Sequence, residues 1–193
     1  MKLAIIDYGA GNIQSLRFAL KRLGVESVLS AKIDEIKSAD KIIFPGVGAA
    51  NAAMEKLQVT GLDTLIPKLQ QPVLGICLGM QLMCNASEEG NTKGLGIFNC
   101  NVKRFPTSVK VPQMGWNTLN NCKGALFQNI QPNEYMYLVH SYYAPLIEET
   151  IAETTYGKSY STALQKNNFY GVQFHPEKSS KAGSQLLSNF LAL

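Results

Sequence analysis

Short apolar segments alternate with helical ones along the first half of the chain, and this alternation limits the folds available to it. Four segments have the length and composition of buried strands: 2–7, 25–30, 41–44 and 72–76. Apolar side chains recur at helical spacing between them, over 13–23, 49–57 and 62–69. Gly24 offers a left-handed cap for the first helix. The pattern predicts a parallel sheet covered by helices.

The second half changes character after a polar loop at 87–94. Four β-type segments follow with short connectors: NVKRF (101–105), YMYLVHSYY (135–143), STALQ (161–165) and FYGVQF (169–174). They predict antiparallel or mixed strands added to the sheet, before a closing helix at 181–193. We therefore expect one domain over 1–193 with an α/β fold, a three-layer α/β/α sandwich with a central, mostly parallel sheet and added antiparallel strands.

Composition argues against several classes of function. No apolar run is long enough to cross a bilayer, and the start MKLAIID has the pattern of a strand, so we expect a cytoplasmic protein without membrane contact. A net charge of +4, with only Phe105 as an aromatic near the basic cluster, argues against nucleic acid. The four cysteines lack metal-site spacing, which predicts reduced thiols and no metal.

Three glycine-containing turns follow predicted strands: YGAGN (8–12), PGVG (45–48) and CLG (77–79). Ligands of open α/β sheets collect at the carboxyl ends of the strands, so we expect a site there. YGAGN lacks the third glycine of a dinucleotide loop and the lysine of a P-loop, so no nucleotide cofactor is expected. We interpret it as a crevice loop in which Asn12 caps the next helix.

The segment GICLG (75–79) has the pattern of a nucleophile elbow, with a strand before it and a predicted helix, LGMQLMCNA (78–86), after it. The flanking glycines are expected to let the backbone bend sharply and expose Cys77 at the start of that helix. The alternative is a small buried hydrophobic residue at a helix start. We interpret Cys77 as a nucleophile.

A nucleophilic thiol needs a base, and only His140 and His175 are available. Pro176 restricts His175 to extended geometry, and residues two apart in an extended segment share a side, which places Glu177 beside it. These residues would complete a Cys-His-Glu triad, the alternative being a surface His-Glu pair. His140, after an apolar strand, is expected to be a packed or hydrogen-bonding residue.

The PGVG turn (45–48) ends the neighbouring strand. Its glycines can bring backbone N–H groups close to a group bound at Cys77, as an oxyanion hole requires. The alternative is an ordinary Pro-Gly turn.

These motifs together resemble the class I, triad-type glutamine amidotransferases, in the order PGVG, GICLGMQ and HPEKS. More closely, the chain is similar to the glutaminase subunits of imidazole glycerol phosphate synthases. This likeness runs nearly end to end, through IIDYGAGNIQS, FPGVGA, VPQMGWN, YLVHSYY and GVQFHPEKSS. The resemblance implies a flavodoxin-like fold, no cofactor and a glutaminase reaction, in which Cys77 attacks the side-chain amide, His175 shuttles the proton and Glu177 holds the imidazole.

The resemblance also implies roles for residues around the triad. It assigns the oxyanion to the N–H of Leu78 and of Val47 or Gly48. It assigns the amino-acid part of glutamine to three further residues: Gln81, Ser141 and Tyr142.

The resemblance implies a (β/α)₈-barrel cyclase partner in a heterodimer, which uses the ammonia in histidine biosynthesis. Four residues match the docking face: Met114, Trp116, Tyr137 and Lys178. A core position is the alternative for Trp116. Glutamine hydrolysis is expected to be slow without the partner. The alternative function is that of a paralogue supplying ammonia to a different acceptor, such as a surface sugar; a binding module without catalysis is a third reading.

Overall fold

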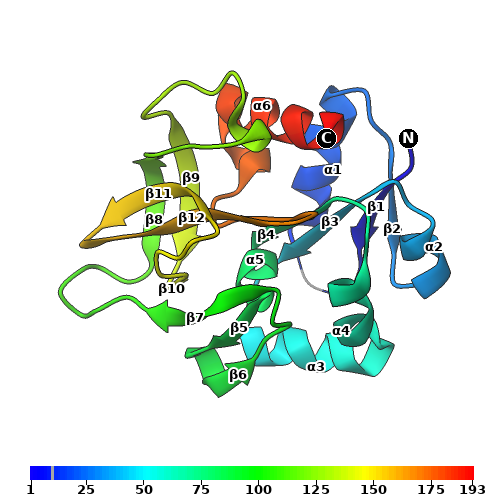
Figure 1. Cartoon of the computed structure of the whole chain (residues 1–193), viewed down its shortest axis with the longest axis horizontal. Coiled ribbons are helices and arrows are strands. Elements are labelled where there is room, and N and C mark those ends of the chain that lie inside the picture. Colours follow the sequence, from blue (N-terminus) through cyan, green and yellow to red (C-terminus); the bar gives the residue numbers. More distant parts are fainter. Residues whose placement is uncertain (10) are drawn as a thin grey trace.

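A seven-stranded sheet runs through the centre of the molecule (Figure 1). The computed structural model describes residues 1–9 and 11–193, so Ala10 of the YGAGN loop lies outside the described residues. In spatial order the strands are β11 (Thr150–Tyr156), β12 (Lys158–Lys166), β13 (Phe169–Val172), β4 (Val73–Cys77), β3 (Lys41–Gly46), β1 (Leu3–Ile6) and β2 (Ser27–Ser30). The five strands from β13 to β2 are parallel, and β12 and β11 are antiparallel. The predicted α/β fold class is confirmed.

Helices cover both faces of this sheet (Figure 1). One face carries α1 (Ile13–Arg22) and α6 (Ser180–Ala192), and the other carries α3 (Ala50–Thr60), α4 (Leu62–Leu65) and α5 (Leu78–Leu82). A short helix, α2 (Ile33–Lys37), lies beside β1. Side chains of a strand alternate between faces, so Leu3 and Ile5 pack in one core while Ala4 and Ile6 pack in the other.

Two smaller sheets stand beside the central one. The first contains β10 (Tyr142–Tyr143), β7 (Phe98–Arg104), β5 (Cys84–Ser87) and β6 (Thr92–Lys93), and the second is the hairpin of β8 (Gln113–Thr118) and β9 (Tyr135–His140). The prediction that NVKRF and YMYLVHSYY join the central sheet was therefore wrong. In β7 buried and exposed residues alternate, so it has only one buried face, whereas a central strand such as β4 is buried throughout.

The predicted helix over 78–86 was also wrong beyond its first turns. Helix α5 ends at Leu82, and the following residues turn into β5. The carbonyl of Met83 accepts hydrogen bonds from the N–H groups of Ile97 and Phe98, so this carbonyl bonds to a distant segment and not to the next turn of a helix. Tertiary pairing thus overrides the helical propensity of LGMQLMCNA.

The two predicted caps of the first helix agree with the structure only in part. Gly24 adopts φ 76 just beyond α1, as predicted. Asn12 stands at the N-cap position, but its side chain makes no capping hydrogen bond. The described part of the chain also contains four 3₁₀ turns: η1 (Ile66–Lys68), η2 (Glu89–Asn91), η3 (Ala125–Phe127) and η4 (Pro176–Lys178). Within residues 1–9 and 11–193, every helix is too short or too polar for a bilayer crossing.

Candidate active site

The carboxyl ends of three adjacent parallel strands meet at one edge of the central sheet. Gly46 at the end of β3 pairs with Cys77 at the end of β4, and Val172 of β13 pairs with Ile76. Because β3 leads into PGVG, β4 into the CLG turn and β13 into QFHPE, these motifs lie together although they are far apart in the sequence.

Cys77 itself makes the sharp turn of the elbow. Its backbone angles are φ 55 and ψ −112, a region that residues with a side chain rarely adopt. The flanking glycines have a different role from the one expected, because neither has a positive φ. A Cβ on Gly79 would lie 1.9 Å from the carbonyl oxygen of Phe44, and one on Gly75 would lie 2.9 Å from the N of Met80. The glycines therefore permit close backbone packing around a strained cysteine.

His175 and Glu177 form a buried pair next to Cys77. Nδ1 of His175 lies 2.9 Å from Oε1 of Glu177, and the two side chains are 5% and 3% exposed. His175 is extended before Pro176, as predicted, but Glu177 reaches it through the 3₁₀ turn η4 and not by strand alternation. A surface location for the pair is excluded.

The protonation of His175 reflects its two neighbours. Burial lowers its pKa, but hydrogen bonds and charge interactions with Cys77 and Glu177 outweigh burial and raise the pKa to about 10. The imidazole is therefore protonated at neutral pH when it lies between a thiolate and a carboxylate. The second carboxylate oxygen, Oε2 of Glu177, is buried and has no hydrogen-bond partner among the described residues.

The PGVG turn packs directly against the elbow. A Cβ on Gly46 would lie 2.7 Å from the N of Gly79 and 2.7 Å from the hydroxyl of Tyr8. The Tyr8 hydroxyl donates a hydrogen bond of 2.9 Å to the carbonyl of Pro45, and burial raises the pKa of Tyr8, so it remains a donor. Gly48 has φ 94, which favours glycine, and it faces open space.

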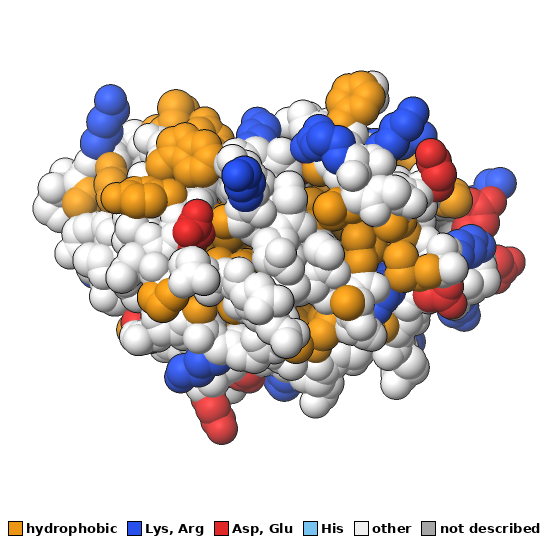
Figure 2. All heavy atoms as spheres, turned by 90° about the horizontal axis from the view of Figure 1, so that it is seen from above, with side chains coloured by type: hydrophobic (Ala, Val, Ile, Leu, Met, Phe, Trp, Pro, Cys, Tyr) orange, Lys and Arg blue, Asp and Glu red, His pale blue; other side chains and the backbone are white. Residues whose placement is uncertain are grey.

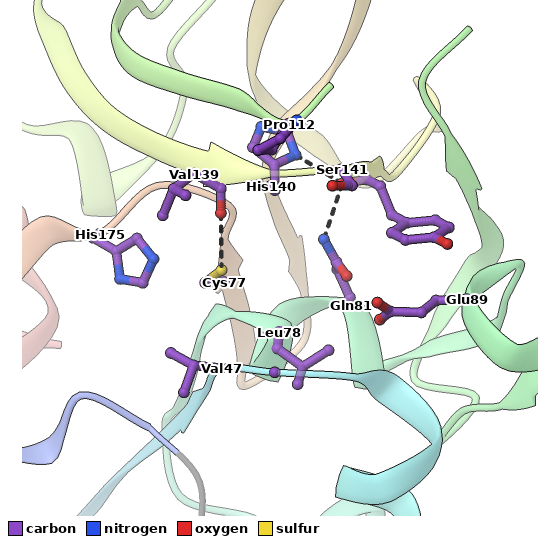
Figure 3. Close-up of a pocket in the computed structure, with 12 residues that line it drawn as sticks. Val47, Cys77, Leu78, Gln81, Glu89, Pro112, Val139, His140, Ser141 and His175 are labelled. Atoms are coloured by element: carbon purple, nitrogen blue, oxygen red, sulfur yellow. Dashed lines mark hydrogen bonds between the residues drawn. The ribbon is translucent and has the colours of Figure 1, made fainter. Parts of the chain in front are cut away.

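A cavity of about 340 Å³ opens beside Cys77 (Figure 3). The cavity brings together eight of the residues selected from the sequence: Val47, Gly48, Cys77, Leu78, Gln81, Ser141, Tyr142 and His175. Four lining residues had no predicted role in binding: Glu89, Pro112, Val139 and His140. Sequence spacing gave no signal for Glu89, whose Oε2 accepts a hydrogen bond of 2.9 Å from the N–H of Ala50.

A polar network forms one wall of this cavity. The carbonyl of Tyr142 lies 3.0 Å from Nε2 of Gln81 and 2.7 Å from Nδ1 of His140 (Figure 3). Burial lowers the pKa of His140 to about 4, so it is neutral at pH 7 and donates from Nδ1 to that carbonyl. This agrees with its interpretation as a hydrogen-bonding residue. Gln81 also donates to Gln173, a residue that the sequence analysis missed.

The four residues selected as a docking face lie outside the cavity, on and near the β8–β9 hairpin. Trp116 is 51% exposed and Met114 is 67% exposed, so the alternative of a core tryptophan is excluded. The rings of Trp116 and Tyr137 meet edge to face at 6.1 Å, and the ammonium of Lys178 lies 5.8 Å from the centre of the Tyr137 ring.

In the part of the chain that the structure describes, no three His, Cys, Asp or Glu side chains gather so that they could hold a metal ion.

Comparison with known proteins gives consistent matches. The family model described as glutamine amidotransferase class-I matches residues 4–193. A Bacteroides fragilis (strain YCH46) protein named imidazole glycerol phosphate synthase subunit HisH is 55% identical, over 100% of both chains. A protein of the same name from Haemophilus influenzae (strain Rd) is 49% identical, over 99% of this chain and 97% of its own.

Solved structures agree on the fold. A Thermoplasma acidophilum protein described as a putative GMP synthase subunit matches with a TM-score of 0.78 at 19% identity, covering 100% of this chain and 92% of its own. PurLQS from Thermotoga maritima matches with a TM-score of 0.72 at 17% identity, covering 99% and 97%. At these identities the likeness concerns the fold alone.

Proposed function

The chain belongs to the class I glutamine amidotransferase family, and from that premise we propose that it hydrolyses glutamine with Cys77, His175 and Glu177 and supplies the ammonia to a cyclase. The observation that carries the proposal is the placement of His175, between a carboxylate at 2.9 Å and the thiol of Cys77, at the edge of a cavity. The relatives named imidazole glycerol phosphate synthase subunit HisH identify the synthase and the histidine pathway. We take 1–193 as one amidotransferase domain that acts in the cytoplasm.

The reaction begins at the sulfur. Cys77 Sγ attacks the side-chain amide carbon of glutamine, and the carbonyl oxygen becomes an oxyanion. Because Nδ1 of His175 is held by Glu177, the ring presents Nε2 to the reacting atoms. His175 gives its proton to the leaving nitrogen, and ammonia departs from a γ-glutamyl thioester. Water then attacks the thioester, His175 accepts a proton from it, and glutamate leaves with the thiol restored.

The oxyanion is held by backbone N–H groups beside the sulfur. Leu78 follows Cys77 directly, and Val47 and Gly48 line the same cavity from the PGVG turn. Removing one such donor typically costs around 3 kcal/mol of transition-state stabilisation. Gly48 has a positive φ, and a Cβ at this position would have no other group within 4 Å. The proposal includes a hydrolysis that depends on the partner, in which the PGVG turn adjusts.

The opposite wall suits the amino-acid part of glutamine. Gln81, Ser141 and Tyr142 contribute polar groups there. Glu89 adds a carboxylate, which is the natural partner for the α-ammonium group of the substrate. We assign Glu89 to substrate binding together with the three residues taken from the resemblance.

The partner is proposed to dock on the β8–β9 hairpin. Figure 2 shows large hydrophobic side chains gathered at the end of the molecule to which this hairpin belongs. Trp116, Met114, Tyr137 and Lys178 provide exposed aromatic and apolar surface with one cation, the composition of an interface centre. The proposed partner is a (β/α)₈-barrel cyclase in a heterodimer, which consumes the ammonia before it reaches solvent.

One experiment tests the proposal. Glutamate release is measured for the chain alone, with a (β/α)₈-barrel cyclase from a relative, and with that cyclase plus its nucleotide substrate. We expect slow hydrolysis by the chain alone and an increase of orders of magnitude with the occupied cyclase. The Cys77→Ala variant serves as the blank. Activation by a surface-sugar enzyme and not by the cyclase would favour the paralogous function instead.

A further inference from the structure

Gln173 lies between Cys77 and Gln81, one of the residues proposed to bind glutamine. It follows β13 directly, is 0% exposed, and its backbone N–H donates to the carbonyl of Thr162 at 2.8 Å. Its side chain lies 3.7 Å from the sulfur of Cys77 through Nε2 and 2.8 Å from Nε2 of Gln81 through Oε1. Gln173 is not among the residues that line the cavity.

A backbone carbonyl determines which end of the Gln173 amide faces the sulfur. The carbonyl of Tyr142 can only accept, so the amide of Gln81 must turn Nε2 toward it. That same Nε2 faces Gln173, which must then present its acceptor, Oε1, to Gln81. The remaining end of Gln173 is Nε2, a donor, and it faces the sulfur. The relay from Tyr142 through Gln81 to Gln173 therefore allows only a donor at the sulfur.

A donor at this position favours the negatively charged sulfur and restrains its direction. Hydrogen bonds to a charged group are stronger than those between neutral groups. A buried amide without partners is costly, so an apolar side chain of similar size would serve a packing role better. Both polar ends of Gln173 are used, one toward Cys77 and one toward Gln81.

We propose that Gln173 is a positioning residue, which directs an N–H at the sulfur of Cys77 and is itself oriented by Gln81. The role rests on the proposed function, because it assists the thiol that attacks glutamine. Gln173 also links the proposed glutamine-binding residues to Cys77, since Gln81 both lines the cavity and orients Gln173.

The test is the pH profile of Cys77 alkylation by iodoacetamide, measured on the full chain without glutamine. The variant Gln173→Met keeps the size of the side chain and removes the donor. We expect its profile to move up by about one pH unit, which makes alkylation about tenfold slower at pH values below the midpoint, with the same rate at high pH. Gln173→Glu places a carboxylate near the sulfur and is expected to move the profile further. Cys77→Ser identifies alkylation at other cysteines.

The matched control is Gln165→Met. Gln165 lies on the neighbouring strand β12, and its Nε2 donates to the Tyr170 hydroxyl at 3.3 Å. The pH profile of alkylation of Gln165→Met is expected to match that of the wild type. With the cyclase present, Gln173→Met is expected to lower kcat for glutamine more than it raises KM, because Gln173 does not line the cavity.

A Gln173→Met profile that overlies the wild type would overturn the inference. If circular dichroism shows that the Gln173 variants do not fold, Gln81→Met tests the relay from its other end. Its profile is expected to move in the same direction by a smaller amount, and no movement would count against the inference. The alkylation measurement needs neither glutamine nor partner, so its outcome is separable from failure of the proposed glutaminase activity.

Discussion

Oε1 of Glu177 lies 2.9 Å from Nδ1 of His175, and neither side chain is more than 5% exposed. This contact fixes which nitrogen of the imidazole is free. With Nδ1 bonded to the carboxylate, Nε2 is the ring nitrogen that remains free for the proton exchange of the proposed reaction. The carboxylate therefore sets the direction of the imidazole and favours its protonated form.

The variant Glu177→Gln is expected to lower glutamine turnover by about 100- to 10,000-fold, because the imidazole loses the negative charge that stabilises its protonated form. Glutamate release in the presence of the cyclase measures this. Glu26→Gln, at an exposed position, is the control and should retain activity. Turnover of Glu177→Gln close to that of the wild type would remove Glu177 from the triad.

Replacement of Cys77 separates chemistry from backbone strain. Both Cys77→Gly and Cys77→Ala are expected to lose activity, but only glycine relaxes the backbone at φ 55. Such strain costs about 1 to 3 kcal/mol, and the greater freedom of unfolded glycine offsets part of it. In urea titrations, we expect the free energy of unfolding of Cys77→Gly to be about 1 kcal/mol higher than that of Cys77→Ala. Greater stability of the alanine variant would contradict the strained elbow.

His140 is expected to make the protein sensitive to acid. Its pKa in the fold is about 4, below the ordinary 6.5, so the unfolded chain binds more protons between these values. The free energy of unfolding therefore falls as the pH drops from 6.5 to 4, by on the order of 3 kcal/mol from this group. Urea titrations at several pH values should show a weaker acid dependence for His140→Gln. Equal dependence in the two proteins would refute the prediction.

Gly79→Ala is expected to destabilise the fold by about 3 kcal/mol or more, because the new methyl group would lie 1.9 Å from the Phe44 carbonyl. Gly61→Ala provides the comparison. Gly61 has φ 71 but nothing within 4 Å of its Cβ position, so its cost is conformational only, about 1 kcal/mol. Thermal or chemical denaturation distinguishes the two. Similar losses in both variants would indicate that the clash is relieved by movement.

Trp116→Ala should weaken cyclase binding at least tenfold without changing the stability of the isolated chain, because the ring is half exposed. Calorimetric titration with the cyclase measures the affinity. Val59→Ala is the control, since Val59 is 88% exposed and lies on α3. Equal affinity of Trp116→Ala and wild type would place the docking surface elsewhere.

The sequence predicted those parts of the structure that depend on neighbouring residues. The strand at 72–76, the turn at Cys77 and the extended His175 before Pro176 all follow from local patterns. The prediction of a helix over 78–86 was wrong because the N–H groups of residues 95–98 bond to backbone carbonyls of residues 82–84. Gln173 was missed because its partner Gln81 is 92 positions away. Gln173 lies just after the end of β13, so only the fold shows what its side chain faces.

The contact between Gly46 and Gly79 ties two segments that are 33 positions apart. Since neither position has room for a methyl group, the PGVG turn and the elbow form one backbone unit. Over evolution, each can drift only within the space that the other leaves, so the two loops should be inherited together. An engineer who wishes to change the substrate of this chain should transplant both loops as a pair, and confine diversity to the side chains of the opposite wall.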